Sequence, residues 1–574
     1  MTTIAVSTSI ATGRRQLATV RQRSLLTAKW RVLWVAALFG TVATSSLVRI
    51  AYLGVVQPAP RSVSMSDALL PARGDIVDRN GVPLARAFRS YALWYNPKAL
   101  GGGSPLVKSP AEVAAALVRE FPELDQAELT RRLASGKPGY LRRRILPENA
   151  NRIHALGEPA LEFPREGERF YPQGSMAAHV LGFVSADGKG RVGMEQVLDA
   201  QLTDPATRGK PAMLSIDSRV QGALEDELGT AIAETEALGA AGVILDVDTG
   251  EILALASLPS FNPNMIEQGN SPNIFNRVTN QVYELGSTFK PLTVAAAIDA
   301  GTVTDLSRRY PSARPLAIGG FQIRDSHAMG GSLNVPEALI HSSNVVTAQV
   351  ADELGGARLK RTMQQLGMNE RPYVELPARG FPLWPGGKWA RITTMTVSYG
   401  HGIAVTPLHL ASAYAAMVNG GIWRPATLHR VAPGNAPEGR RVFKASTSAK
   451  MRQMLRMIVS YGTGRKADAP GFRVGGKTGS AEKPGVGGYR RSSLVATFAA
   501  AFPMDRPRYV VIAMLDAPKG TAATSGPRTA AWNAAPVVAR VVPRIGPLLG
   551  IMPDETRDVD ISDLRPLIPQ GSEE

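Results

Sequence analysis

A serine and a lysine three positions apart stand at the start of a strongly apolar predicted helix. They belong to Gly286-Ser287-Thr288-Phe289-Lys290, where a polar loop gives way to Leu292 and to residues 294–298, all of them valine, alanine or isoleucine. A helix with hardly any polar face belongs at the centre of a domain, so the rest of the chain must enclose this stretch. Residues three apart also share a face of the first turn, which brings the amine of Lys290 beside the hydroxyl of Ser287.

This pair is suited to nucleophilic chemistry. A serine hydroxyl is a poor nucleophile until a base takes its proton, and a lysine can be that base when burial and neighbouring cations lower its pKa enough to leave the amine neutral. Ser287 also stands at the positive end of the helix dipole, which favours a developing anion. Taken alone, the pair is better explained as an ordinary first turn with a solvated lysine.

Two further motifs follow in order along the chain. They are Ser342-Ser343-Asn344 and Lys477-Thr478-Gly479-Ser480. Each has a plain alternative, a helix break for the first and a turn for the second. Serine-x-x-lysine, serine-x-asparagine and lysine-threonine-glycine in this order form the set used by penicillin-binding proteins and serine β-lactamases. Because three short motifs in the right order are far more specific than any one of them, we interpret them as parts of one active site.

The composition narrows the class of protein. A chain of 574 residues is too long for one ordinary core, so we expect two or three domains. The formal net charge is +17, but it is spread along the chain without a basic stripe and interleaved aromatics, so we expect no nucleic-acid partner. An anionic membrane or cell wall would balance this positive charge equally well. The chain has no cysteine, which excludes disulfides, thiolate metal sites and cysteine nucleophiles.

The N-terminal segment predicts a membrane anchor. Residues 1–31 are basic and the first acidic residue is Asp67, while residues 32–48 are uncharged. The apolar run continues past Arg49 to Val56, which is long enough to span a bilayer if Arg49 reaches the far interface. The positive-inside rule keeps the basic flank in the cytoplasm and places the chain from about residue 57 outside it. A cleaved signal peptide is the main alternative, but the run is longer than a signal core and no clear small-x-small site follows.

Beyond the anchor, we expect an α/β chain of the α+β type. Residues 73–85 predict a strand, an Asn-Gly turn and a second strand, and residues 110–156 have a helical, charged pattern. No catalytic set stands out before residue 215. The acidic tail after Ile551 is expected to be poorly ordered.

The second large domain begins with a predicted β-hairpin over residues 240–256. Helices are expected from Ser287 to past Gly355, and the remaining predicted elements are a helix over 407–418, strands at 477–479, 494–502 and 509–515, and a helix over 533–549. Two strands early and three late around a helical middle indicate one mostly antiparallel central sheet, in which the two ends of the domain meet, with helices on its faces.

Motifs over nearly the whole chain resemble those of class B penicillin-binding proteins. They follow the anchor in the family's order: Arg73-Gly74-x-Ile76-x-Asp78-Arg79-x-Gly81, Arg169-x-Tyr171-Pro172, Gly193-x-Glu195, Asp248-x-Gly250-Glu251-Ile252, and the three motifs above. Asn344 and the short region before the catalytic domain look like the division-specific type, the septal peptidoglycan transpeptidase. The family usually has proline where Leu285 stands and often threonine at Ser480, and neither departure alters the expected chemistry.

The resemblance implies the following domain limits: a cytoplasmic tail, 1–31; a transmembrane anchor, 32–56; a pedestal of the penicillin-binding protein dimerisation type, 57–215; a connecting helix, 216–239; a transpeptidase domain like that of serine β-lactamases, 240–550; and an acidic tail, 551–574. The pedestal is expected to be elongated. Neither a cofactor nor a metal ion is expected.

The resemblance also implies a role for each motif residue. Ser287 attacks the carbonyl between the two terminal D-alanines of a peptidoglycan stem peptide, and Lys290 takes its proton. Ser342 and Asn344 line the other side of the cleft, Lys477 supplies positive charge, and Gly479 lies in the same substrate-binding strand. Thr478 and Ser480 bind the substrate carboxylate, and the main-chain N–H groups of Ser287 and Ser480 form the oxyanion hole.

The implied setting is the bacterial cytoplasmic membrane, with the N-terminus inside and the catalytic domain in the periplasm or outside the cell. Stem peptides are the substrate and β-lactams would trap the acyl-enzyme. A septal glycosyltransferase and other division proteins are the expected protein partners. An elongation-specific class B transpeptidase and a catalytically weak membrane scaffold remain as alternatives.

Three other enzyme classes fit less well. Residues 471–478 match the pattern of a phosphate-binding loop, but Ala469-Pro470 before it and the glycines after it do not predict the required strand and helix. A Ser-His-Asp hydrolase would need a Gly-x-Ser-x-Gly elbow, which is absent from the sequence, and the spacing of its histidines singles out no base or metal ligand. A soluble β-lactamase would need neither the anchor nor residues 57–215.

Overall fold

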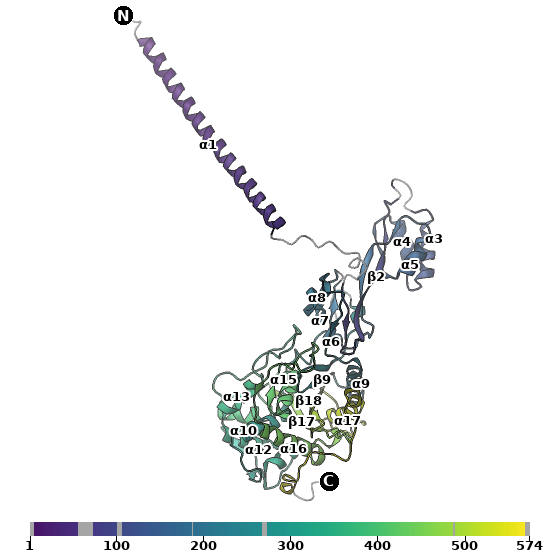
Figure 1. Cartoon of the computed structure of the whole chain (residues 1–574), viewed down its shortest axis with the longest axis vertical. Helices are drawn as coiled ribbons and strands as arrows, with labels where there is room; N and C mark the ends of the chain where they lie inside the picture. The colour runs from purple at the N-terminus through teal and green to yellow at the C-terminus, as the bar shows by residue number, and fades with distance from the viewer. Residues whose placement is uncertain are drawn as a thin grey trace. The chain divides into compact units, whose positions relative to one another are not determined.

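The computed structural model describes residues 5–55, 73–99, 101, 106–185, 187–266, 273–485 and 488–568 (Figure 1). Two compact units can be separated, residues 1–70 and 71–574, and each is described by itself. Five predicted segments lie in part outside the described residues: the cytoplasmic tail (1–4), the anchor (56), the pedestal (57–72, 100, 102–105 and 186), the transpeptidase domain (267–272, 486 and 487) and the acidic tail (569–574).

Helix α1 (Ala5–Val55) dominates the first unit and is 51 residues long. Its stretch Thr27–Tyr52 has a mean hydropathy of 1.5, and by length and composition it can cross a membrane. The hydroxyls of Thr41 and Thr44 donate to carbonyls one turn earlier, so the helix satisfies these polar groups itself. The predicted cytoplasmic tail continues the same helix from Ala5, and it contains neither proline nor any acidic residue.

A five-stranded sheet lies at the centre of the second unit, in the order β10-β9-β19-β18-β17. All its neighbouring strands are antiparallel. The prediction that strands from the two ends of the domain meet is therefore confirmed, since β9 pairs with β19. The bounds are β9 (Gly239–Asp246), β10 (Ile252–Leu258), β17 (Gly475–Gly485), β18 (Gly488–Phe502) and β19 (Tyr509–Asp516).

Alternate residues of these strands point into two different cores. In β19, Val510, Ile512 and Met514 belong to one core, and Val511, Ala513 and Leu515 to the other. Helices α9 (Ser218–Thr235) and α17 (Ala534–Ile545) cover the second face (Figure 1). The first face carries α15 (Pro407–Val418), with α10 (Lys290–Asp299), α12 (Asn344–Leu354) and α16 (Ala445–Tyr461) packed around it. Because both faces are covered, the inner strands β9 and β19 and the neighbouring β10 are almost entirely apolar, whereas the edge strand β17 carries the polar residues of the third motif.

Short elements complete this domain. They are the helices α11 (Val335–Ile340), α13 (Gly356–Gln365) and α14 (Arg391–Ser398), the 3₁₀ turns η1 (Pro263–Met265), η2 (Gly286–Phe289), η3 (Arg465–Ala467), η4 (Pro547–Leu549) and η5 (Arg565–Leu567), and the strand pairs β11 (Tyr310–Pro311) with β14 (Ser332–Leu333), β12 (Leu316–Ile318) with β13 (Phe321–Ile323) and β15 (Ile422–Trp423) with β16 (Arg440–Arg441).

The N-terminal part of the second unit is built on a six-stranded sheet. The predicted strands on either side of the Asn-Gly turn are present as β1 (Ile76–Val77) and β2 (Pro83–Tyr95). The other strands of the sheet are β3 (Gly139–Ile145), β4 (Leu161–Glu162), β5 (Arg165–Phe170) and β8 (Ala212–Met213). The helices are α3 (Pro110–Glu120), α4 (Gln126–Ala134), α5 (Pro147–His154), α6 (Ala178–Leu181), α7 (Gly193–Val197) and α8 (Asp199–Thr203), and β6 (Phe183–Val184) pairs with β7 (Gly190–Val192).

A buried ion cluster holds this part together. The carboxylate of Glu195 is fully buried and accepts from Arg73 Nε at 2.7 Å and from Arg169 Nε at 2.6 Å. Arg169 Nη1 also donates to the carbonyl of Gly74 at 2.6 Å. Three of the sequence motifs that precede residue 215 therefore meet in one structural cluster.

The predicted connecting helix at residues 216–239 is present as α9, and it also packs on the central sheet. The α9 side chains of Val220, Leu224 and Leu228 are fully buried and share a core with β9 and α17. Their spacing of four places them on one face of the helix, which lies on the central sheet. The N-terminal part reaches this helix through Asp78, whose Oδ2 accepts from the N–H and the hydroxyl of Ser218 at 3.0 and 2.8 Å.

The acidic tail also differs from expectation, because residues 551–568 are packed on the domain. Asp558 accepts from Arg456 of α16 at 2.8 Å, and Asp563 is ion-paired with Lys450 of the same helix. Leu564 and Ile568 are buried. Two acidic residues of the tail thus pair with basic residues of α16, a match that depends on the fold and not on the local sequence.

Replacing Glu195 with glutamine should lower the free energy of unfolding by about 3–5 kcal/mol, because the buried Arg169 loses its carboxylate partner and Arg73 keeps only Asp199. Urea denaturation followed by tryptophan fluorescence measures this. Glu128→Gln is the matched control, since its partner Arg131 is exposed, and it should cost less than about 1 kcal/mol. If the two variants had the same free energy of unfolding, the buried cluster would not be stabilising.

Candidate active site

Ser287 lies in the tight turn η2, directly before α10. The helix proper begins at Lys290, and Ser287 precedes it in a 3₁₀ turn, whereas the sequence predicted one continuous helix. Gly286 has φ +55°, which favours glycine. Ser287 is half-buried, and its hydroxyl makes no hydrogen bond within the described part of the chain. The nucleophile candidate is therefore presented at a sharp turn with an unengaged hydroxyl.

Two glycines let other segments press against this turn. A Cβ at Gly479 of β17 would lie 2.3 Å from the carbonyl oxygen of Leu285, and a Cβ at Gly400 would lie 2.3 Å from that of Gly286. Both distances are too short for any side chain. The lysine-threonine-glycine motif thus contains glycine because β17 lies against the nucleophile turn.

Lys290 is completely buried and turns toward the second motif. Its Nζ donates to Ser342 Oγ at 3.0 Å and also to the carbonyl oxygen of Ser342. Burial and the positive charge of Lys477 hold the pKa of Lys290 well below its usual value, and the carboxylate of Asp325 opposes them. A buried site beside a second cation is the environment in which a lysine amine can be neutral and act as a base.

Ser342 stands between two lysine amines. Its Oγ accepts from Lys477 Nζ at 2.9 Å as well as from Lys290. Its backbone has φ +63°, an uncommon conformation for a non-glycine residue that typically marks functional positions. The structure therefore brings the three motifs together on a single hydroxyl.

Lys477, Thr478 and Ser480 lie on β17, the edge strand of the sheet. Lys477 is fully buried, which lowers the pKa of its amine to about 7. Its Nζ also donates to Thr478 Oγ1 at 3.1 Å. Ser480 Oγ accepts from the N–H of Ala530 at 3.0 Å. The edge position leaves one side of β17 without a partner strand, beside the turn that holds Ser287.

Asn344 begins α12, and its side-chain amide donates to the carbonyl of Arg324 at 2.9 Å. The neighbouring Asp325 accepts from Ser343 Oγ at 2.9 Å, from Val345 N at 3.1 Å, and from Asn344 N. An aspartate at a helix N-terminus satisfies free N–H groups and favours the dipole. Asp325 thereby fixes the backbone on which Ser342 and Asn344 stand.

Sequence reasoning missed Asp325, Thr463 and Tyr414. Thr463 Oγ1 lies 2.9 Å from Thr478 Oγ1, and its N–H donates to Ile340 O at 3.2 Å. Tyr414 OH donates to the carbonyl of Thr288 at 2.8 Å. No motif marks these residues, because each lies outside the three motifs and contacts them only in the folded chain. A buried tyrosine hydroxyl within α15, whose side chains are mostly apolar, is the one signal that could have identified Tyr414.

The geometry argues against two of the alternative enzyme classes, the phosphate-binding-loop enzyme and the Ser-His-Asp hydrolase. Residues 475–485 form strand β17, so no helix follows the apparent phosphate-binding loop, and Arg473 of that loop is ion-paired with Asp505 at 2.7 Å. Among the described residues, no hydrogen bond joins a histidine to Ser287. His409 instead bonds to Thr406 and to the carbonyl of Glu370, 2.8 Å from its Nε2.

Comparison with known proteins agrees with this geometry. A family profile described as the penicillin-binding protein transpeptidase domain matches residues 240–536, and one described as the penicillin-binding protein dimerisation domain matches residues 68–210. The matched dimerisation domain corresponds to the predicted pedestal.

Curated relatives cover most of the chain. The probable peptidoglycan D,D-transpeptidase FtsI of Caulobacter vibrioides is 41% identical over 84% of this chain and 82% of its own length. The peptidoglycan D,D-transpeptidase FtsI of Escherichia coli K12 is 31% identical over 82% of this chain and 85% of its own. The crystal structure of penicillin-binding protein 3 from Mycobacterium tuberculosis, complexed with aztreonam, superposes with a TM-score of 0.65 at 26% identity, covering 84% of this chain and 98% of that one.

Three observations agree on the family of this chain: the three motifs converge on Ser342, two domain profiles match, and the similarity to the relatives extends over most of both chains. This chain belongs to the penicillin-binding protein family of D,D-transpeptidases.

Proposed function

We propose that this protein crosslinks peptidoglycan as a membrane-anchored serine D,D-transpeptidase, with Ser287 as nucleophile and Lys290 as general base. The observation that carries the assignment is the buried Lys290 amine, whose pKa is held low by burial and by Lys477, one turn after the Ser287 hydroxyl. A neutral amine is the form that can take a proton. The FtsI relatives, whose printed names are peptidoglycan D,D-transpeptidases, support the substrate.

The first half-reaction forms the acyl-enzyme. Ser287 Oγ attacks the carbonyl carbon between the two terminal D-alanines while Lys290 takes the hydroxyl proton. The N–H groups of Ser287 and Ser480 stabilise the oxyanion, and each such donor is worth about 3 kcal/mol in other enzymes. When the tetrahedral intermediate collapses, the peptide C–N bond breaks, and the departing D-alanine amine receives a proton through Ser342, which contacts both lysines.

The second half-reaction transfers the acyl group. The amine of a neighbouring stem peptide attacks the ester carbonyl, loses a proton through the same groups, and restores the Ser287 hydroxyl. Lys477, Thr478 and Ser480 hold the carboxylate of the donor peptide, because β17 carries a buried positive charge and two hydroxyls side by side with the nucleophile turn. Asn344 holds the substrate amide from the opposite wall.

The setting is the cytoplasmic membrane. The apolar stretch Thr27–Tyr52 anchors the chain, the basic flank stays in the cytoplasm, and the domains after residue 57 face the periplasm or the cell exterior. Septal wall synthesis is the process that the motif set and the FtsI relatives favour. A septal glycosyltransferase and other division proteins are the corresponding partners.

A fluorescent penicillin should label the full-length protein covalently and release slowly. Ser287→Ala should abolish the adduct, and Lys290→Ala should slow its formation by about 10²–10⁴-fold, the usual contribution of a general base. Lys519→Ala is the control, since Lys519 pairs with Glu236 at an exposed position. Labelling of the folded Ser287→Ala variant at the wild-type rate would refute the assignment of the nucleophile.

The efficiency of acylation by benzylpenicillin should be bell-shaped in pH. It should fall above about pH 7 because Lys477, with its pKa of about 7, loses the charge that attracts the carboxylate. It should also fall at low pH, where Lys290 gains a proton. In Lys477→Arg the alkaline decline should disappear, since a guanidinium stays charged. A stopped-flow pH profile tests this, and an unchanged alkaline limb in Lys477→Arg would show that another group causes it.

Depletion of the protein in its host should stop crosslinking at the septum while the cells keep their rod shape. Labelling of new wall with a fluorescent D-amino acid shows where incorporation fails. Loss of rod shape with septal incorporation intact would instead place the enzyme in elongation.

A further inference from the structure

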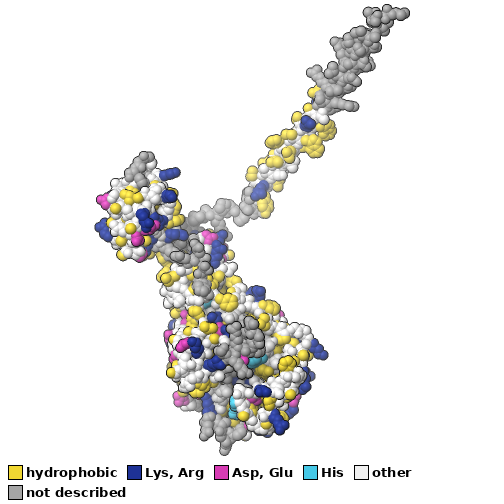
Figure 2. Space-filling view, turned by 180° about the vertical axis from the view of Figure 1, so that it is seen from behind, with side chains coloured by type: hydrophobic (Ala, Val, Ile, Leu, Met, Phe, Trp, Pro, Cys, Tyr) yellow, Lys and Arg dark blue, Asp and Glu magenta, His cyan; other side chains and the backbone are white. Residues whose placement is uncertain are grey.

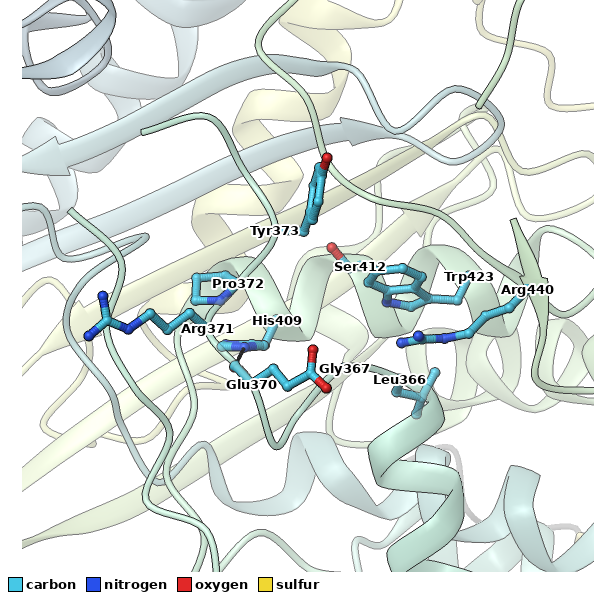
Figure 3. A pocket seen from close by; sticks show the side chains of 10 residues that line it. All are labelled: Leu366, Gly367, Glu370, Arg371, Pro372, Tyr373, His409, Ser412, Trp423 and Arg440. Carbon is cyan, nitrogen blue, oxygen red and sulfur yellow. Dashed lines mark hydrogen bonds between the residues drawn. The ribbon is translucent and has the colours of Figure 1, made fainter. Parts of the chain in front are cut away.

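A separate pocket lies where the end of α13, the loop 367–373, α15 and the β15–β16 strand pair meet (Figure 3). Its volume is about 70 Å³, enough for a group of a few heavy atoms. None of its residues belongs to the active site described above. The lining consists of Leu366, Gly367, Glu370, Arg371, Pro372, Tyr373, His409, Ser412, Trp423 and Arg440.

The pocket has a buried floor and an exposed rim. Leu366, Pro372 and Ser412 are buried, whereas Glu370 and Arg440 are exposed and Tyr373 is 59% exposed. His409 is also buried, which lowers its pKa to about 4, so its ring is neutral at pH 7. Both ring nitrogens of His409 are engaged within the protein, as described above. The floor is therefore fixed and mostly apolar, and the groups left for a ligand lie on the walls.

Two wall groups have no hydrogen-bond partner in the described part of the chain. Trp423 Nε1 is buried and unpaired, and the carboxylate of Glu370 accepts no hydrogen bond. The carboxylate points toward Trp423 and Arg440 across the pocket, while Arg371 points away (Figure 3). A buried N–H without an acceptor has lost its hydrogen bond to water, so a ligand group that accepts from it restores that bond.

The wall of the pocket that carries the N–H donors, Trp423 and Arg440, is held in place by packing and hydrogen bonding. Trp423 and Arg440 are paired across the β15–β16 strands, and the Arg440 guanidinium lies 4.0 Å from the centre of the Trp423 ring. Arg440 Nε donates to the carbonyl of Gln365 at 2.5 Å, which ties it to the end of α13. A Cβ at Gly367 would lie 3.3 Å from Trp423 Cζ2, so the ring edge rests against the glycine. The orientation of the indole N–H is therefore set by packing before any ligand binds.

A neutral group with both an acceptor and a donor fits these walls best. A simple anion would meet the Glu370 carboxylate, and a simple cation would meet the Arg440 guanidinium. An acetamido group has a carbonyl oxygen for Trp423 Nε1, an N–H for Glu370, and a methyl group for the apolar floor. We propose that this pocket binds the acetamido arm of an N-acetylated amino sugar, and thus a glycan strand.

The sugar ring itself has a place at the rim. The exposed face of Tyr373 offers an aromatic surface of the kind that packs against the apolar face of a pyranose. The choice of an amino sugar among acetamido compounds rests on the proposed function, since the glycan strands of peptidoglycan are built from N-acetylated amino sugars. The recognition of the acetamido group rests on the pocket alone.

Calorimetric titration of the full-length protein in detergent with the tetrasaccharide of N-acetylglucosamine tests this. Cellotetraose, which has hydroxyls in place of the acetamido groups, is the matched ligand, and N-acetyl-D-alanyl-D-alanine tests whether any acetamide suffices. Trp423→Phe removes the N–H and keeps a ring, and Glu370→Met removes the acceptor. Trp532→Phe is the control variant, because Trp532 lies outside the pocket, stacked on Lys466.

The tetrasaccharide should bind wild type and Trp532→Phe alike, and bind Trp423→Phe and Glu370→Met about five- to tenfold more weakly, the equivalent of one lost hydrogen bond each. Penicillin labelling of Ser287 should be unchanged in both pocket variants, which shows that they fold. The proposal is overturned if the tetrasaccharide does not bind, if cellotetraose binds equally well, if both pocket variants bind like wild type, or if the dipeptide binds more tightly and responds to Trp423→Phe. Failure of penicillin labelling would refute the proposed function and leave the glycan result standing.

Discussion

Two lysine amines share one serine hydroxyl at the centre of this molecule. Lys290 and Lys477 are both fully buried, and each donates to Ser342 Oγ. Two ammonium groups at such proximity, away from water, repel each other strongly, so the charged form of at least one is disfavoured. Burial and the charge of Lys477 both lower the pKa of Lys290, so the low pKa of Lys290 depends in part on the presence of Lys477. Burial, first, and the proximity of Lys477, second, make a neutral base available.

The surrounding fold keeps these groups together. Lys290 starts α10, Ser342 precedes α12, and Lys477 lies on β17, so three elements distant in sequence must be held in register. Glycine permits the closest of these approaches, because Gly479 and Gly400 leave room for the backbone of the Ser287 turn. Asp325 fixes the start of α12, and Thr463 links the end of α11 to Thr478. The chemistry thus depends on backbone packing as much as on the side chains that perform it.

Motifs in the N-terminal half serve a different purpose. Arg73, Arg169 and Glu195 form a buried ion cluster, and Asp78 binds the start of α9, which lies on the catalytic sheet. These residues are as recognisable in the sequence as the catalytic ones. Their burial and pairing identify them as structural, which no sequence pattern distinguishes. The glycan pocket is the opposite case, because its residues form no motif and its unpaired indole N–H is visible only in three dimensions.

The sequence by itself determined the three motifs that meet at the candidate site, the single sheet shared by the early and late strands of the domain, and the apolar stretch near the N-terminus. These features depend on local signals: motif spacing, the turn residues of the hairpins, and a run of apolar residues too long for a core helix. The tertiary structure alone decided that α9 belongs to the sheet, that the acidic tail lies on α16, and that Asp325, Thr463 and Tyr414 support the site. Each of these rests on contacts between separate elements, from 15 residues apart for Thr463 and Thr478 to 126 for Tyr414 and Thr288, where charge or shape matches only after folding.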